Sequence, residues 1–187
     1  MLLYLSTIYY YTWEQRKLGD LLDKKISNGI MNRESATETG IKHINVVNMY
    51  TPDKIHINDL TWFDGTEKDI EKCDVKYGDV FVTRSSLKVE GIAEPNVLLD
   101  YGRFVFDDHL LQLRFSKECS PLFCKILLGT KHIKTQFMTK SKTTTMTTIG
   151  QEDITSSVGL FPKLEEQKKI ADYFQNLDTL ITLHQRK

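Results

Sequence analysis

The fold of this chain depends on the stretch Gly159-Leu160-Phe161-Pro162-Lys163-Leu164-Glu165-Glu166-Gln167-Lys168-Lys169-Ile170. Pro162 is predicted to stop an extended segment, and an amphipathic helix then continues to Lys187. The apolar residues of this helix recur at steps of three and four, which is the spacing of one helical face. They are Ile170, Tyr173, Phe174, Leu177, Leu180 and Ile181, with His184 in the same stripe. A face this broad must pack on its own domain or on another helix.

The composition is that of a globular protein, with 40% hydrophobic and 27% charged residues among 187. Because 25 basic side chains balance 25 acidic ones, we do not expect a non-specific nucleic-acid binder, which is usually basic. The charge is unevenly placed, however, since residues 119–151 hold lysines and no acidic residue. These lysines are Lys125, Lys131, Lys134, Lys140 and Lys142. The segment is either a solvated surface or a surface that faces phosphates, and charge alone leaves both readings open.

Cysteine usage and the first residues indicate the compartment. Cys73, Cys119 and Cys124 are odd in number and lack the spacing of zinc ligands, which favours a reducing cytoplasm. Residues 1–11 are apolar and aromatic, but they lack a basic start and a small-residue cleavage site. They are also too short to span a membrane. We therefore expect a buried or irregular lead-in, a cytoplasmic location and no membrane partner.

The first half of the chain is predicted to be rich in strands. A short helix is expected over 13–22, a turn at Ser27-Asn28-Gly29 and a loop over 30–40. Extended segments are predicted at 43–48, 80–84, 91–99, 103–106 and 109–115. Gly78-Asp79 is the turn before the second of these, and Pro95 places the third at an edge or interrupts it.

The second half is predicted to be mainly helical. Ser120-Pro121 is a helix start, Gly129 ends or bends that helix, and a second helix follows over 131–138. A polar loop is expected over 139–148, and an extended segment over 149–158. Strands followed by helices predict an α+β fold, with a mixed or antiparallel β-rich domain, a small helical part and the long terminal helix.

Motifs of catalysis are missing from the sequence. It contains neither a glycine-rich phosphate loop nor a dinucleotide-binding fingerprint, and its five histidines are scattered. Acidic residues cluster over 53–79 without the tight spacing of a metal-dependent nuclease. We predict no catalytic residue and no metal ligand in this chain, and a nuclease built on the acidic segment is the least favoured alternative.

Several motifs resemble one family. Trp13-Glu14-Gln15-Arg16-Lys17-Leu18-Gly19 looks like the opening of a target recognition domain in the specificity (S) subunit of type I restriction-modification enzymes. The stretch from Gly78 to Ser86 is similar to the Gly-Asp strand and following loop of that family. The end of the chain carries further matches at Thr147-Thr148-Ile149, Asp153-Ile154, Phe161-Pro162, Glu166-Gln167-Lys168-Lys169-Ile170 and Leu177-Asp178-Thr179-Leu180-Ile181. The resemblance covers residues 12–187.

The resemblance implies a non-catalytic subunit that reads a split sequence in double-stranded DNA. Such subunits dock methyltransferase (M) subunits on long antiparallel helices, and the complex recruits restriction (R) subunits. S-adenosylmethionine, ATP and magnesium are expected in those partners, and no cofactor is expected in this chain. By analogy, residues 12–160 are expected to form the target recognition domain. Residues 161–187 are expected to form the conserved helix for spacing, dimerisation and methyltransferase docking.

The sequence departs from the family pattern in having one recognition domain and one conserved helix where a complete S subunit has two of each. The expectation is therefore a half-subunit. Two copies would pair their helices antiparallel through Ile170, Tyr173, Phe174, Leu177, Leu180 and Ile181. The resulting homodimer would read a symmetric split target with two identical domains. A helix over 165–187 spans roughly 34 Å at about 1.5 Å per residue, which is close to one turn of DNA.

Two polar loops are the candidates for DNA contact. They contain Arg84, Ser85, Ser86 and Lys88 in one loop, and Lys140, Lys142, Thr143, Thr144 and Thr145 in the other. Arginine can read guanine with two hydrogen bonds, while lysine and threonine suit phosphates. For each single residue, a solvated side chain is about as well supported as a DNA contact. In a competing interpretation, the chain uses the same helix to bind methyltransferase subunits without productive DNA recognition.

Overall fold

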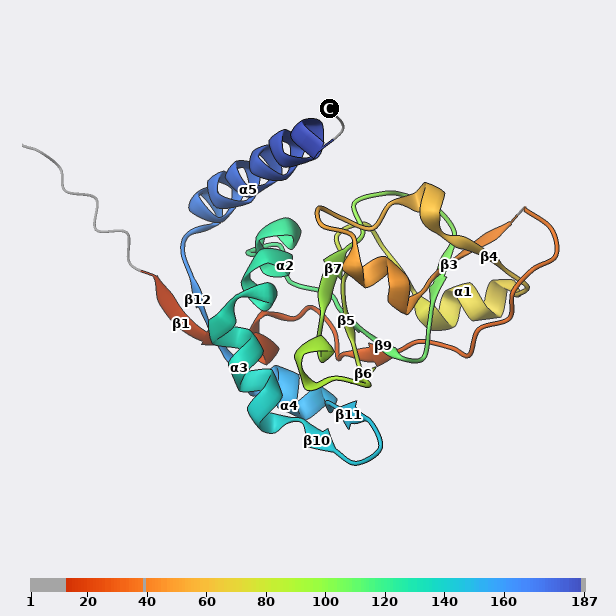
Figure 1. Ribbon diagram of the computed structural model, residues 1–187, viewed down its shortest axis with the longest axis horizontal. Coiled ribbons are helices and arrows are strands. Elements are labelled where there is room, and N and C mark those ends of the chain that lie inside the picture. Colours follow the sequence, from red (N-terminus) through yellow and green to blue (C-terminus); the bar gives the residue numbers. More distant parts are fainter. Residues whose placement is uncertain (1–12, 39, 186–187) are drawn as a thin grey trace, which may run out of the picture.

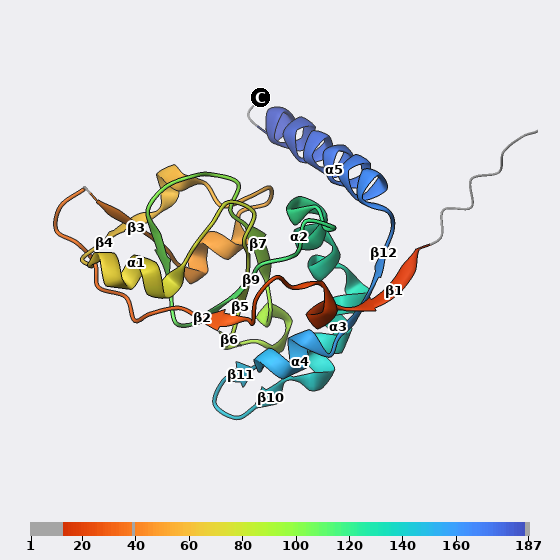
Figure 2. The ribbon, with the colours of Figure 1, turned by 180° about the vertical axis from the view of Figure 1, so that it is seen from behind.

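The computed structural model describes residues 13–38 and 40–185 (Figures 1 and 2). The predicted lead-in at 1–11 and the predicted helix end at 186–187 lie outside the described residues. Strands dominate the first half, helices the second, and a long helix closes the chain, so the predicted α+β class is confirmed. No helix in the described part of the chain is long and apolar enough to cross a membrane.

A four-stranded antiparallel sheet of order β2-β9-β5-β7 lies at the centre. Its strands are β2 (Ser27–Asn28), β9 (Leu110–Leu113), β5 (Val80–Thr83) and β7 (Pro95–Val97). Gly78 adopts a φ of 88° immediately before Asp79 and β5, and this left-handed backbone confirms the predicted turn. Pro95 stands on the edge strand, as predicted, where a missing N–H can be tolerated.

The two faces of this sheet cover two separate hydrophobic cores. Val80 and Val82 of β5 belong to a core shared with the helices of the second half. Phe81, which points to the other face, belongs to a core shared with the strands of the first half. Both faces are therefore buried, and even the polar Gln112 of β9 has no exposed surface. The central sheet thus lies between two layers of the molecule.

One covering layer is a three-stranded sheet of order β4-β3-β8 with a helix beside it. Its elements are β4 (Thr61–Phe63), β3 (Ile41–Ile44), β8 (Phe104–Phe106) and α1 (Glu67–Cys73). β3 is parallel to β8 and antiparallel to β4. Phe106 packs against Phe81 of the central sheet with 5.1 Å between ring centroids, which joins the two layers.

Helices form the opposite layer. They are α2 (Pro121–Gly129), α3 (Lys131–Lys140), α4 (Gln151–Thr155) and α5 (Leu164–Gln185). α2 packs on β7 and on α5. Two strands lead to α5, namely β1 (Glu14–Lys17) and β12 (Val158–Phe161), which pair antiparallel. Short 3-10 turns occupy Leu18–Leu21, Val46–Tyr50, Ile57–Asp59 and Val89–Gly91.

A small three-stranded sheet of order β10-β11-β6 lies at the far end of the molecule from α5 in both views (Figures 1 and 2). Its strands are β6 (Ser85–Ser86), β10 (Lys142–Thr143) and β11 (Thr147–Thr148). The predicted loop over 139–148 is therefore wrong in part, because α3 continues to Lys140 and a hairpin follows. The hairpin forms because β11 finds a partner in β6, far away in sequence.

Other local predictions are also wrong. Residues 13–22 form β1 and a 3-10 turn instead of one helix, because β12 pairs with the whole of β1. Ser27 and Asn28 form a strand instead of a turn, because they pair with Gln112 and Leu111. The predicted strand over 43–48 ends at Ile44 and continues as a 3-10 turn.

The predicted extended segment over 149–158 contains α4. Asp153 caps this helix by accepting a 2.9 Å hydrogen bond from the Gly150 N–H. The predicted bounds of α2 and the predicted start of α5 are confirmed. α2 begins at Pro121 after Ser120 and ends at Gly129, and α5 begins two residues after Pro162. The Ser120 side chain, however, makes no capping hydrogen bond.

Candidate nucleic-acid interface

The β5 strand delivers Arg84 and β6 to the surface. Thr83, the last residue of β5, is buried, and its hydroxyl closes the loop that follows. It donates a 2.8 Å hydrogen bond to the Gly91 carbonyl and accepts one of 2.8 Å from the Glu94 N–H. Both ends of the loop are therefore held together at Thr83, which restricts the backbone of the residues between them.

The small sheet brings the two predicted DNA-contacting loops together. Ser86 of β6 pairs with Thr147 of β11, and Ser85 pairs with Thr148. β11 in turn pairs with β10, so that Lys142 lies opposite Thr148. The two loops, which the sequence separates by more than fifty residues, form a single surface. We call this surface, made of β6, β10, β11 and the residues that flank them, the hairpin surface.

Three cations of the hairpin surface have no partner within the described part of the chain. Arg84, Lys88 and Lys142 are exposed, and their side chains make no hydrogen bond or ion pair with another described residue. Thr144 and Thr145 are exposed at the turn of the hairpin. These groups retain their full capacity to bind an anionic ligand.

The remaining predicted residues are placed differently. The Lys140 ammonium group donates to the Ser156 hydroxyl at 2.8 Å, the Ser157 hydroxyl at 3.0 Å and the Asp153 carbonyl at 3.3 Å. Lys140 therefore points back to the end of α4. Thr143 shares a 3.0 Å hydrogen bond with Thr147, so its hydroxyl is used within the hairpin.

Two hollows lie at the hairpin surface. One, of about 360 Å³, has Arg84 and Lys142 in its lining. The other, of about 490 Å³, has Ser85 and Ser86 of β6 in its lining. Sequence reasoning missed several residues that line them, namely Asn28, Gln151 and Asp153 in the first hollow, and Tyr50, Leu87, His109 and Met146 in the second. Leu87 could have been found from its position between predicted residues. Asn28 could not, because the central sheet alone brings it there.

A charge network lies at the other end of β5. Asp79 is fully buried, and its carboxylate accepts hydrogen bonds from Arg114 at 2.7 Å and 2.8 Å. Gln112 and the Lys76 N–H also donate to it. Hydrogen bonds to Asp79 raise the pKa of Arg114 further above its ordinary value. Burial alone would raise the pKa of neighbouring Asp74, but Arg114 and Lys24 outweigh it and lower the pKa to about 2. The Gly-Asp motif therefore has a structural role.

Other acidic residues of 53–79 are also engaged in the fold. Asp69 caps α1 and contacts Arg33 at 2.7 Å, while Asp53 contacts His56 at 2.8 Å. In the described chain, one group has the spacing of metal ligands, namely Asp107, Asp108 and His109, whose ligand atoms lie within 4.8 Å of one another. Asp107 already accepts hydrogen bonds from the His109 backbone and ring at 2.8 Å and 2.9 Å, as turns commonly require.

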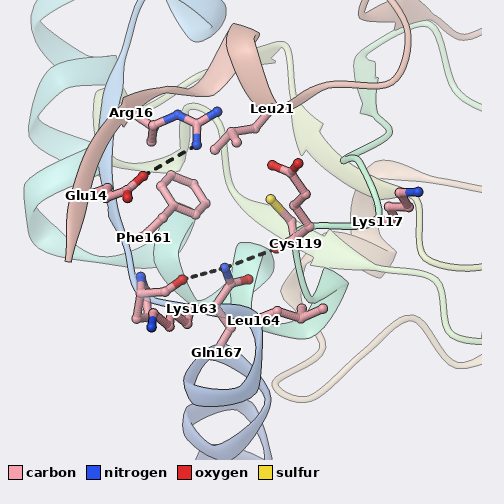
Figure 3. Close-up of a pocket in the computed structure, with 11 residues that line it drawn as sticks. Glu14, Arg16, Leu21, Lys117, Cys119, Phe161, Lys163, Leu164 and Gln167 are labelled. Atoms are coloured by element: carbon pink, nitrogen blue, oxygen red, sulfur yellow. Dashed lines mark hydrogen bonds and ion pairs between the residues drawn. The ribbon is translucent and has the colours of Figure 1, made fainter. Parts of the chain in front are cut away.

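The α5 helix is anchored at its start and exposed beyond it. Gln167 is buried, accepts a 2.9 Å hydrogen bond from the Ser120 N–H, and donates to the carbonyls of Glu118 and Pro162. Figure 3 shows this amide facing a pocket of about 480 Å³ where β1, β12 and α5 meet. Ala171 is also buried.

Further along α5, the predicted apolar stripe is only partly covered. Ile170 and Leu177 are half-buried. The others remain exposed, at 62% for Tyr173, 44% for Phe174, 55% for Leu180 and 54% for Ile181. The domain therefore does not bury this face, and the remaining apolar surface is of a kind that usually marks a contact with another protein.

Comparisons with known proteins agree with this fold. The family model described as the type I restriction modification DNA specificity domain matches residues 10–187. A structure from work on complex assembly and conformational transition of the type I R-M system has a TM-score of 0.63 and 17% identity, covering 98% of this chain and 43% of that one. No curated protein sequence matches the chain.

Two further solved structures are similar. The type I restriction-modification S subunit from M. genitalium has a TM-score of 0.55 and 16% identity, covering 97% of this chain and 45% of that one. The HsdS subunit from Thermoanaerobacter tengcongensis has a TM-score of 0.59 and 16% identity, covering 98% and 42%. At these identities the likeness shows the fold. The chain spans less than half the length of each of these proteins.

Proposed function

The chain belongs to the family of type I restriction modification DNA specificity domains, and we propose that it reads one half of a split target in double-stranded DNA. The observation that carries this proposal is the hairpin surface. It gathers Arg84, Lys88 and Lys142, three cations that have no partner among the described residues, beside the hydroxyl groups of two polar loops. Such cations position a protein on phosphates or read guanine, and hydroxyl groups add contacts of either kind.

The chain would leave catalysis to its partners. Under this proposal, residues 12–160 are the target recognition domain, and residues 161–187 are the helix that docks methyltransferase subunits. Those subunits would supply S-adenosylmethionine, and restriction subunits would join through the complex with ATP and magnesium. The zero net charge supports this division, because a neutral module needs partners to complete its grip on DNA. Three free cysteines support a cytoplasmic location.

Methylation mapping tests the proposal. The chain is co-expressed with its methyltransferase subunit, and adenine methylation is mapped across the host genome. A split motif supports sequence reading by this chain, and a palindromic motif supports two copies in one complex. A stable complex without methylation would favour the alternative, in which the chain binds methyltransferase subunits without productive DNA recognition. Cleavage of DNA by the purified chain with magnesium would favour the alternative of a nuclease built on the acidic segment.

The exposed part of α5 supports a helix pair between two copies. Leu180 and Ile181 are both slightly more than half exposed, so burying their exposed part against a second α5 would stabilise the pair by roughly 1 kcal/mol per side chain. We expect the double variant Leu180→Ser and Ile181→Ser to raise the dimer dissociation constant about tenfold or more. Sedimentation equilibrium measures this.

The matched control carries Gln175→Ser and Asn176→Ser, which alter two exposed polar residues of the same helix. It should leave the dimer unchanged. A wild-type chain that sediments as a monomer at all concentrations, with α5 intact by circular dichroism, would contradict the helix pair without touching DNA recognition.

A further inference from the structure

Leu87 is a large aliphatic residue that the fold leaves in solvent. Its exposed fraction is 82%, although it follows directly after the half-buried β6. It lies between Ser86 and Lys88 on the hairpin surface. An aliphatic side chain gains nothing from phosphates, so its place among the cations requires a different explanation.

The loop holds Leu87 in a defined position. The Ser86 hydroxyl accepts a 3.2 Å hydrogen bond from the Lys88 N–H, which closes a small turn around Leu87. The Lys88 carbonyl then accepts one of 3.1 Å from the Gly91 N–H. Together with the hydrogen bonds of Thr83 to the end of the loop, these contacts reduce the entropy lost when Leu87 binds a partner.

An apolar hollow lies beside Leu87. It measures about 490 Å³, and its apolar walls are Val46, Tyr50, Leu87 and Met146. Ser85, Ser86, Lys88, Glu90, Gly91 and His109 complete the lining. The Ser85 hydroxyl is buried here without a hydrogen-bond partner in the described chain. This apolar site is therefore continuous with the polar strand β6 and with a phosphate-binding candidate, Lys88.

We propose that Leu87 and this hollow receive the C5-methyl group of a thymine in the major groove. The inference rests on the proposed function. Among the groups that base pairs display in the major groove, the thymine methyl is the apolar one, and apolar side chains recognise it. Arg84 and Lys88, on either side of β6, would hold the phosphate backbone while Leu87 contacts the base edge. Leu87 is then a specificity-determining residue.

Deoxyuridine tests this directly, because it differs from thymidine only by the missing methyl group. Duplexes that carry the methylation target are made with each thymine of one half-site replaced in turn, and binding by the complex with methyltransferase subunits is measured. At one position we expect wild type to bind the deoxyuridine duplex about fourfold more weakly, the value of one buried methyl group. Leu87→Ala should bind both duplexes equally at that position.

Val89→Ala is the matched control, because Val89 lies in the same loop but does not line the hollow. It should keep the fourfold difference. The inference is overturned if no position discriminates thymine from deoxyuridine, if Leu87→Ala still discriminates, or if the half-site contains no A·T pair. Absence of any sequence-specific binding would instead contradict the proposed function, and the inference with it.

Discussion

Arg114 and Arg84 follow neighbouring antiparallel strands, β9 and β5, and therefore lie at opposite ends of the same ribbon. At one end, Arg114 is engaged by the buried Asp79 and by Asp74. At the other end, Arg84 is exposed, and its side chain makes no hydrogen bond or ion pair with a described residue. One end of the ribbon has its charges neutralised inside the fold, and the other presents them outward.

The difference separates two uses of polar residues in this protein. Where the hydrogen-bonding capacity of a buried side chain is satisfied internally, its loss should cost stability. Where a surface side chain has no internal partner, its removal should weaken ligand binding and leave stability almost unchanged. Single substitutions, each measured for stability and for DNA binding, distinguish these two uses.

The largest effect is expected at Arg114. Arg114→Met would leave the fully buried Asp79 carboxylate without its cation, so we expect a loss of about 3–5 kcal/mol in the free energy of unfolding. Urea unfolding followed by circular dichroism measures this. The matched control is Arg84→Met, which should change stability by less than about 0.5 kcal/mol yet weaken DNA binding about tenfold. Equal effects of the two substitutions on stability would refute the comparison.

Gln167 extends the comparison to α5. Its amide satisfies backbone groups of Glu118, Ser120 and Pro162, so Gln167→Ala should lower the free energy of unfolding by about 1–3 kcal/mol. Gln175→Ala alters an exposed glutamine of the same helix and should have almost no effect. Both are measured by urea unfolding. If the two variants were equally stable, the start of α5 would not be anchored by this amide.

The smallest effect separates two lysines of one loop. Lys142→Ala should weaken DNA binding by a few-fold for every sequence and reduce the slope of log affinity against log salt by about 1, because one phosphate contact is lost. Lys140→Ala should leave the slope unchanged and cost stability instead, since its ammonium group holds the end of α4. Fluorescence anisotropy at several salt concentrations gives both slopes. A reduced slope for Lys140→Ala would place it at the DNA after all.

Sequence reasoning succeeded where the signal is local. The Gly78 turn, the Ser120-Pro121 helix start and the terminal helix each depend on residues within one turn or one helical face. It failed for β1, whose sequence Glu-Gln-Arg-Lys has no strand pattern, because the strand exists only by pairing with Val158–Phe161. It failed for α4 as well, since five residues carry too weak a helical period and the Asp153 cap decides the structure.

The candidate site shows the same difference between what local sequence predicts and what long-range contacts decide. The residue types alone marked two polar loops, the family and a terminal helix with an apolar face in need of a partner. Tertiary structure alone joined those loops through β6 and β11, turned Lys140 inward, left Lys142 outward and placed Leu87 beside an apolar hollow. The physical reason is the separation along the chain between the residues that interact. Turns, caps and helical faces arise from neighbours in the chain, whereas strand pairing and the satisfaction of a charge depend on residues that only folding brings together.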